Sequence, residues 1–202
     1  MSTPASISSF SQALLFADLG PRKMAVDFSG GTLSSDGGSP RLRQLDASLG
    51  LTRTLAGCFS DHRQQNFVEH STQQLLAQRI YGLVLGYEDI NDHEQLRRDP
   101  VLAAACGKPD PLGQDRVNPE DRGQPLAAPS TLNRLELSNN KQTRCHKLPH
   151  DPAKVEACLL AMGVRCLQKH AKEVVIDLDS MGHLVHGLQE GRHYIDHYGD
   201  YC

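Results

Sequence analysis

VVIDLDSMGHLVHGLQEGRHYIDHYGDYC, residues 174–202, is the stretch that decides how the fold of this chain is interpreted. It opens on three β-branched residues and continues with a two-residue alternation, a pattern typical of a buried strand. Residues two apart share a face of a strand, so Asp177 and Asp179 point the same way, with Cα atoms roughly 6.6 Å apart. Two carboxylates on one face of an apolar strand are costly unless a cation or a helix N-terminus compensates them.

A divalent cation is the natural compensating charge for this pair of carboxylates. Mg²⁺ takes one or two protein carboxylates and completes its octahedron with water and phosphate oxygens. Two such ions can activate a water or a 3′-hydroxyl and stabilise the leaving oxygen in phosphodiester cleavage. Asp179 and Asp177 are therefore candidate catalytic and metal-ligating residues. In the alternative, the pair ends a strand, where one aspartate is solvated and the other caps the next turn.

Four histidines in the same stretch offer a different metal site. They are His183, His186, His193 and His197, and imidazole is the commonest ligand of zinc. Their spacing lacks the four-residue helical repeat of metalloprotease sites, and a hairpin would distribute the rings over both faces. The sequence therefore disfavours zinc, although stoichiometric zinc in the purified protein would support it.

The composition places the chain in the globular class, with 202 residues, 39% hydrophobic and 22% charged. A formal net charge of −3 excludes the broad basic surface of a dedicated nucleic-acid-binding domain, so any DNA contact must be local. Each local basic cluster is more often a solvated surface than a phosphate clamp. These clusters are Arg22 with Lys23, Arg41 with Arg43, Arg97 with Arg98, and the run from Lys141 to Lys147.

The cysteines and the N-terminus bear on the cellular compartment. The six cysteines include no CxxC pair, which argues against both a zinc knuckle and a redox motif. The first residues show neither a secretory signal nor an apolar run long enough to span a membrane. We therefore expect a cytoplasmic chain with reduced thiols and no membrane partner.

The chain before residue 170 has the apolar periodicity of helices. A leucine stripe over residues 42–49 is closed by Gly50, a candidate C-cap. The clearest helix begins at Ser71, which forms a capping-box pattern with Gln74 and opens an apolar face that continues to Tyr87. Further N-cap positions are predicted at Asn91, Asp99, Ser130 and Asp151.

Changes of composition divide the chain into three parts. Residues 1–40 are predicted to be a flexible, turn-rich N-terminal segment. Residues 41–170 are predicted to be helical, with a loop or linker near 108–129, where Pro, Gly, Asp and Gln replace apolar periodicity. Residues 171–202 start a third part, where the period switches from helix to strand. The last helix before this switch should reach about Lys169, with the inner face Val155, Cys158, Leu159 and Met162.

Four pieces of the sequence resemble one protein family. They are VDFSGGTLSSDGG (26–38), the block 58–108 with QRIYGLVLGYEDINDH at its core, STLNRLE (130–136), and residues 174–202. They look like the N-terminal part of bacterial insertion-sequence transposases of the DDE type. The nearest group is the insertion-sequence thirteen-eighty family, with the group-one DDE domain. The similarity covers most of the chain in the expected order, and the central block is long and specific.

The resemblance implies a fold and an activity. The fold is a mostly α N-terminal region followed by the first β-hairpin of an RNase H-like α/β domain, in which Asp, Asp and Glu hold two Mg²⁺ ions for strand cleavage and transfer. The family's HGxQEG hairpin is matched by residues 186–191, which makes Asp179 the first catalytic carboxylate, with Asp177 second. The helical region, residues 41–170, is expected to bind the terminal inverted repeats of the element, with STLNRLE near the DNA.

Two departures from the family pattern shape the functional expectation. Residues 181–184 replace acidic and hydroxyl groups that the family carries beside the site. The family places its other two catalytic acids beyond the position of Cys202, so we expect a truncated transposase that is inactive alone and holds Mg²⁺ only when the full site is completed. The alternative is a DNA-binding regulator that inhibits full-length transposase, through competition or mixed assembly. A homo-oligomer is a further expected partner, and the nucleoid is the expected location.

Overall fold

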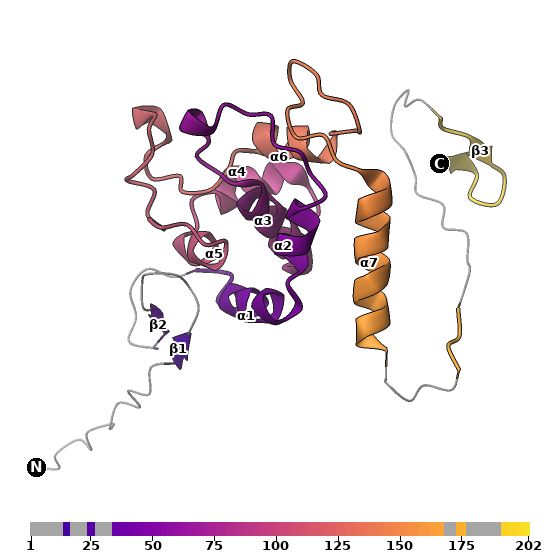
Figure 1. Ribbon diagram of the computed structural model, residues 1–202, viewed down its shortest axis with the longest axis horizontal. Helices are drawn as coiled ribbons and strands as arrows, with labels where there is room; N and C mark the ends of the chain where they lie inside the picture. The colour runs from indigo at the N-terminus through magenta and orange to yellow at the C-terminus, as the bar shows by residue number, and fades with distance from the viewer. Residues whose placement is uncertain (1–13, 17–23, 27–33, 168–172, 177–190) are drawn as a thin grey trace, which may run out of the picture. The chain divides into compact units, whose positions relative to one another are not determined.

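The computed structural model describes residues 14–16, 24–26, 34–167, 173–176 and 191–202. The chain divides into two units, residues 1–166 and 167–202, which are described separately below (Figure 1). The elements are β1 (Leu14–Phe16), β2 (Met24–Val26), α1 (Ser39–Leu49), α2 (Leu51–Ala56), η1 (Gln65–Phe67), α3 (Thr72–Val84), η2 (Ile90–Asp92), α4 (His93–Leu96), α5 (Pro100–Ala105), η3 (Pro119–Asp121), α6 (Pro129–Glu136), α7 (Pro152–Cys166), β3 (Tyr194–Ile195) and β4 (Asp200–Tyr201).

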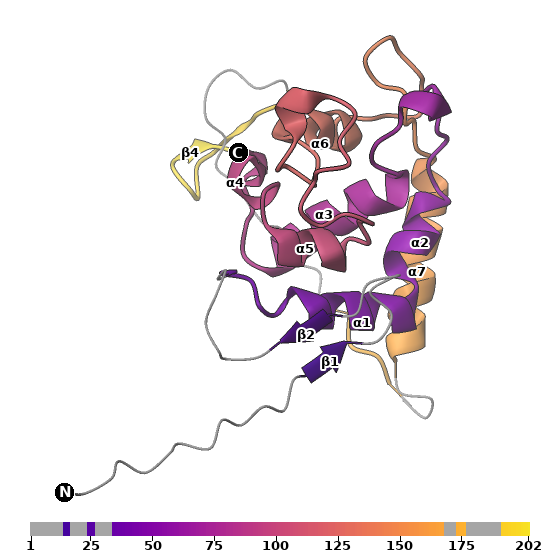
Figure 2. The same cartoon turned by 90° about the vertical axis from the view of Figure 1, so that its left-hand side faces the viewer.

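Helix α3 is the central helix of the first unit, and α2 and α6 both contact it (Figures 1 and 2). The predicted capping box at its start is confirmed. The Ser71 hydroxyl accepts a hydrogen bond from the Gln74 backbone N–H at 3.2 Å, and the Gln74 side chain accepts one from the Ser71 N–H at 3.0 Å. The predicted apolar face is buried at Leu75 and Ala77 but exposed at Leu83 and Val84. The predicted extent was wrong, because the helix ends at Val84 and does not continue to Tyr87.

Two of the other predicted helix starts are confirmed. The Asp99 carboxylate accepts hydrogen bonds from the backbone N–H groups of Val101 and Leu102, at the start of α5. The Asp151 carboxylate accepts from the N–H groups of Ala153 and Lys154, at the start of α7. In both helices a proline follows the cap at the first helical position, where its fixed φ suits a helix and its missing N–H costs nothing.

Two predicted caps are wrong. Asp89 takes the capping role assigned to Asn91, because its carboxylate accepts from the Asn91 N–H at 2.8 Å and opens η2. Helix α6 begins at Pro129, one residue before the predicted cap Ser130, so the residue at the N-cap is Ala128. The preorganised φ of the proline decides the start here, and the hydroxyl of Ser130 lies inside the first turn.

Three clusters of buried apolar residues hold the helices together. The first joins α3 to α5 around Leu102, and the second joins α3 to α6 around Leu132. The third joins α2 to α7 around Cys158. The predicted inner face of α7 was wrong at Leu159, which is 53% exposed, and the helix ends at Cys166.

Helix α1 is anchored by a polar contact as well as by part of the predicted leucine stripe, since Leu42 packs against the first cluster. Gly50 ends the helix in a left-handed conformation with φ 71°, as expected for its C-cap, but Leu45 is 55% exposed. Asp46 is buried, and its carboxylate accepts hydrogen bonds from the Thr52 N–H at 2.9 Å and from the Tyr81 hydroxyl at 2.9 Å. Burial of Tyr81 and its bond to Asp46 raise the pKa of the phenol. This carboxylate therefore ties α1, α2 and α3 together.

The segment before α6 is a loop that packs against the core. Leu126 and Ala127 are 1% exposed. The buried Gln78 amide, on α3, donates to the Ala127 carbonyl at 2.9 Å and accepts from the Ala127 N–H at 2.9 Å. This two-point contact fixes the loop two residues before α6 begins, and so sets where α6 starts on the surface.

The second unit contains an antiparallel hairpin, in which Tyr194 pairs with Tyr201 and Ile195 with Asp200. The predicted buried strand is not present over the part of it that is described: residues 173–176 have no strand conformation, and Val175 is 85% exposed. A strand needs a partner for its backbone groups, and no partner strand for these four residues occurs in the described ranges. The mostly α region with a C-terminal hairpin matches the predicted fold class, and the RNase H-like sheet stays a prediction.

Candidate nucleic-acid interface

The residues predicted to hold a metal lie mostly outside the part of the chain that the structure describes. Asp177 and Asp179 are outside it, as are His183 and His186. The remaining two histidines of the cluster, at 193 and 197, lie in or next to the C-terminal hairpin. In the described ranges no group of three or more His, Cys, Asp or Glu side chains could hold a metal ion. The described residues form no such acidic or metal-binding cluster, but they do form a cluster of basic side chains.

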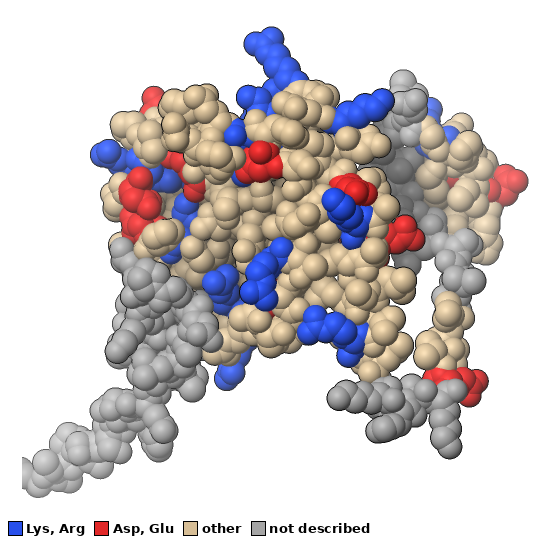
Figure 3. Space-filling view, viewed as in Figure 1, with Lys and Arg blue, Asp and Glu red and all other residues tan. Residues whose placement is uncertain are grey.

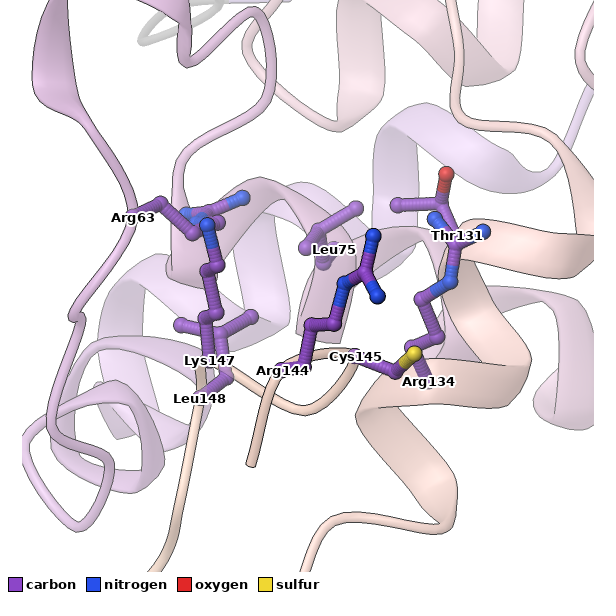
Figure 4. A pocket seen from close by; sticks show the side chains of 8 residues that line it. All are labelled: Arg63, Leu75, Thr131, Arg134, Arg144, Cys145, Lys147 and Leu148. Carbon is purple, nitrogen blue, oxygen red and sulfur yellow. The ribbon is translucent and has the colours of Figure 1, made fainter. Parts of the chain in front are cut away.

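Four basic side chains line one pocket of about 380 Å³ in the first unit (Figure 4). Arg63 comes from the loop after α2, Arg134 from α6, and Arg144 and Lys147 from the loop between α6 and α7. The other lining residues are Leu75, Thr131, Cys145 and Leu148. Figure 3 shows basic side chains projecting at the top of the molecule, where the loop between α6 and α7 lies in Figure 1.

Backbone contacts bring two distant segments of this pocket side by side. Phe59 and His150 form an antiparallel bridge, and their rings lie 5.5 Å apart. The Ser60 N–H donates to the carbonyl of residue 149 at 2.8 Å, and the His62 N–H donates to the Lys147 carbonyl at 2.9 Å. Because the bridge continues to Lys147, the backbone itself sets Lys147 beside the segment that carries Arg63 (Figure 4).

The four basic side chains differ in how their charge is compensated. Arg63 is paired with Asp61, since its Nη2 lies 2.7 Å from Oδ2 of that carboxylate. Arg134, Arg144 and Lys147 are exposed, and no carboxylate of the described residues forms an ion pair with any of them. Neighbouring positive charges without counter-ions favour binding of an anion, because an anion relieves their mutual repulsion. The charge of this pocket is therefore suited to an anion.

The first turn of α6 adds to the positive potential beside the pocket. Its N-cap, Ala128, has a methyl side chain that caps no N–H group, Pro129 has none to offer, and the Thr131 N–H donates to the Ala128 carbonyl at 2.9 Å. Thr131, in this turn, lines the basic pocket, and Ser130 lines two neighbouring hollows. The positive end of the helix dipole thus lies beside Thr131, whereas Arg134 comes from the last turn of α6.

A neighbouring hollow shares Arg63 and Lys147 but carries compensated charge. Its buried cation, Arg116, forms an ion pair with Glu69 at 2.9 Å, and its Nη1 lies 2.7 Å from Nε2 of His70. Burial of His70, followed by the nearby charges of Lys108 and Arg116, lowers its pKa to about 3. His70 is therefore neutral near pH 7 and accepts a hydrogen bond from Arg116. These contacts hold the loop before α6, whereas the uncompensated charge lies in the first pocket.

Part of this basic surface is predicted by the sequence. The predicted basic run 141–147 contributes Arg144 and Lys147, and STLNRLE contributes Arg134. Arg97 and Arg98, another predicted cluster, both pair with Glu94, and so form the solvated kind of surface. Arg63 could not be predicted, because no local sequence signal shows that this single arginine lies next to the loop that carries Arg144 and Lys147.

Comparison with known proteins gives one match. The family model for the transposase DDE domain, group 1, matches residues 16–202. No curated protein and no solved structure matches the chain. Among the described residues, none of the helices has the length and apolar character that crossing a membrane requires.

Proposed function

Because the chain belongs to the group 1 family of transposase DDE domains, we propose that it binds the terminal inverted repeats of an insertion sequence in DNA transposition. Within the family we assign it to the insertion-sequence thirteen-eighty group, on the long central block 58–108. The DNA is bacterial and lies in the nucleoid, where the chain acts. The observation that supports end binding best is the basic pocket lined by Arg134, Arg144 and Lys147.

The charge of this pocket suits a DNA backbone. Each phosphate that a lysine or arginine neutralises releases condensed counterions, which drives binding at low salt. Three uncompensated cations that line one pocket provide such contacts within a small area. The net charge of −3 leaves the rest of the surface without a broad basic field, so the contact is local. STLNRLE, which forms the larger part of α6, lies against the DNA in this proposal.

Binding is tested by fluorescence anisotropy with a labelled duplex that carries the terminal inverted repeat and a duplex with the same bases shuffled. Specific recognition predicts an affinity for the repeat that is at least about a thousandfold higher. Equal affinity for both duplexes would refute end recognition, and absence of binding to either would refute the proposal as a whole. Added in excess, a chain that binds the ends without cutting them would also inhibit full-length transposase, which is the regulator alternative.

For catalysis, we propose that Asp179 is the first metal-binding carboxylate and Asp177 its neighbour, in an RNase H-like domain that begins near residue 171. Their two-residue spacing and the HGxQEG match at residues 186–191 support the assignment. Mg²⁺, held by carboxylates, would polarise a phosphate oxygen and activate the attacking water or hydroxyl. The other two catalytic acids of the family's site would have to come from elsewhere than Asp177 and Asp179.

Removal of the two carboxylates is expected to weaken Mn²⁺ binding. Mn²⁺ takes the oxygen ligands that suit Mg²⁺, and binding abolishes the electron paramagnetic resonance signal of the free ion. Without the remaining acids the chain should hold the ion only weakly, with DNA phosphate oxygens completing the coordination, and in the presence of DNA the variant D177N/D179N should bind Mn²⁺ about tenfold more weakly still than the unmodified chain. The matched control is D196N/D200N, which removes two carboxylates from the nearby hairpin. The assignment is wrong if both variants retain the original affinity, or if the control loses as much.

A further inference from the structure

We propose that the basic pocket accepts one unpaired nucleotide of the bound DNA, with its base on the apolar floor and its phosphates on the cationic rim. The proposal rests on the proposed function, because the DNA must be bound before a base can enter. It assigns a chemical class of ligand to the pocket: a nucleotide outside the base stack, rather than a phosphate of an intact duplex.

The floor of the pocket is apolar. Leu75, on α3, is 0% exposed, and Leu148 is 7% exposed. Both line the pocket, Leu75 between the Arg63 and Arg144 side chains and Leu148 next to Lys147 (Figure 4). A site for phosphate alone would gain nothing from such a floor, whereas the face of a nucleobase is apolar and gains from leaving water. The volume of about 380 Å³ falls within the range of small-molecule sites, roughly 300–1,000 Å³.

The walls carry the groups that recognise a base and its phosphates. Figure 4 shows the Arg144 side chain rising between Leu75 and Thr131, with the guanidinium of Arg134 on the same side. A planar guanidinium stacks on a base and also donates to its edge. On the opposite side of Leu75 stand Lys147 and Arg63, and a lysine acts as a point charge for a phosphate.

A paired base cannot reach this floor. In a duplex only the base edges face the grooves, so a base must leave the stack before its face can contact the apolar lining at Leu148. Extrusion costs a few kcal/mol for a paired base and much less for a base that is already unpaired. The pocket should therefore favour DNA that carries an unpaired nucleotide over the same DNA fully paired.

The test compares two labelled duplexes of one sequence, which differ by a single unpaired adenosine in the middle. Anisotropy titration of the full chain should give roughly tenfold tighter binding to the duplex with the unpaired adenosine. Cys145→Trp fills the pocket without removing a charge, because Cys145 is an exposed lining residue. This variant should lose the preference for the unpaired adenosine. Cys166→Trp, at the exposed end of α7, should retain that preference.

The outcomes separate the inference from the proposed function. Binding of both duplexes with equal affinity by the unmodified chain overturns the inference, needs no variant, and leaves DNA binding intact. Failure to bind either duplex overturns the proposed function itself. A preference that survives in Cys145→Trp, with an unchanged thermal unfolding midpoint, places the unpaired nucleotide elsewhere and also overturns the inference.

Discussion

Replacing Arg134, Arg144 and Lys147 together by alanine is expected to weaken DNA binding by roughly a thousandfold at low salt. Each of these cations is exposed and unpaired with carboxylates of the described residues, so its full charge is available to a phosphate. Because bound counterions are released in proportion to the phosphates neutralised, the slope of log affinity against log salt should become shallower by about 2–3 units. The fold should be unaffected, since the three side chains lie on the surface.

Anisotropy titrations over a range of salt concentrations measure both effects. The matched control is R53A/R98A/K154A, which removes the same charge from exposed positions on α2, after α4 and on α7. This control should lose no more than about fivefold in affinity, through the change of net charge alone. If control and pocket variants lose affinity equally, the binding is a general effect of charge and the basic pocket has no special part in it.

A second large effect is expected from acidification, which should unfold the helical unit through two buried histidines. Burial, followed by the charges of Lys108 and Arg116, lowers the pKa of His70 to about 3. Burial, followed by the charge of Arg79, lowers the pKa of His93 to about 4. In the unfolded chain both titrate near 6.5, so between these values the unfolded state binds more protons than the folded state.

The sign of the pH dependence follows from that difference. Above about pH 6.5 both histidines are neutral in the folded and the unfolded chain, and they cost no stability. As the pH falls from 6.5 toward 4, only the unfolded chain takes up these protons, so the folded state loses stability. From pH 7 to pH 5 the free energy of unfolding should decrease by about 2–4 kcal/mol. Urea unfolding at a series of pH values measures this free energy.

Neutral variants identify the groups responsible. His70→Gln keeps an acceptor for Arg116, and His93→Asn keeps an acceptor for Gln78. The double variant should show a much smaller loss of stability over the same pH range. A pH dependence equal to that of the unmodified chain would show that other groups cause the acid sensitivity.

The helices could be predicted where their signals are local. The capping box at Ser71 and the Asp-Pro starts at Asp99 and Asp151 involve hydrogen bonds within three residues, so the sequence alone contains them. The prediction failed at Ser130 because Pro129 beside it is a stronger start signal. The buried strand predicted around residue 175 failed over the described residues 173–176 for a different reason. A β-branched run becomes a strand only where a partner strand pairs with it, and partners are distant in sequence.

The pocket could not be predicted as a unit. Its basic residues come from three segments, which are assembled by the bridge between Phe59 and His150 and by the contact of Gln78 with Ala127. Neither contact leaves a periodic signal in the sequence, since one is a single backbone bridge and the other a single buried amide. The polar anchor at Asp46 was missed for the same reason, because a buried carboxylate is recognised only from its partners.

The most direct test of the central claim, that DNA occupies the basic pocket, is the rate at which N-ethylmaleimide alkylates individual cysteines. Cys145 lines the pocket and Cys166 ends α7, and both thiols are exposed. Mass spectrometry gives each rate with and without a saturating duplex that carries the terminal inverted repeat. The account predicts that the duplex slows alkylation of Cys145 severalfold and leaves Cys166 unchanged. Equal Cys145 rates in the free and DNA-bound chain would contradict it.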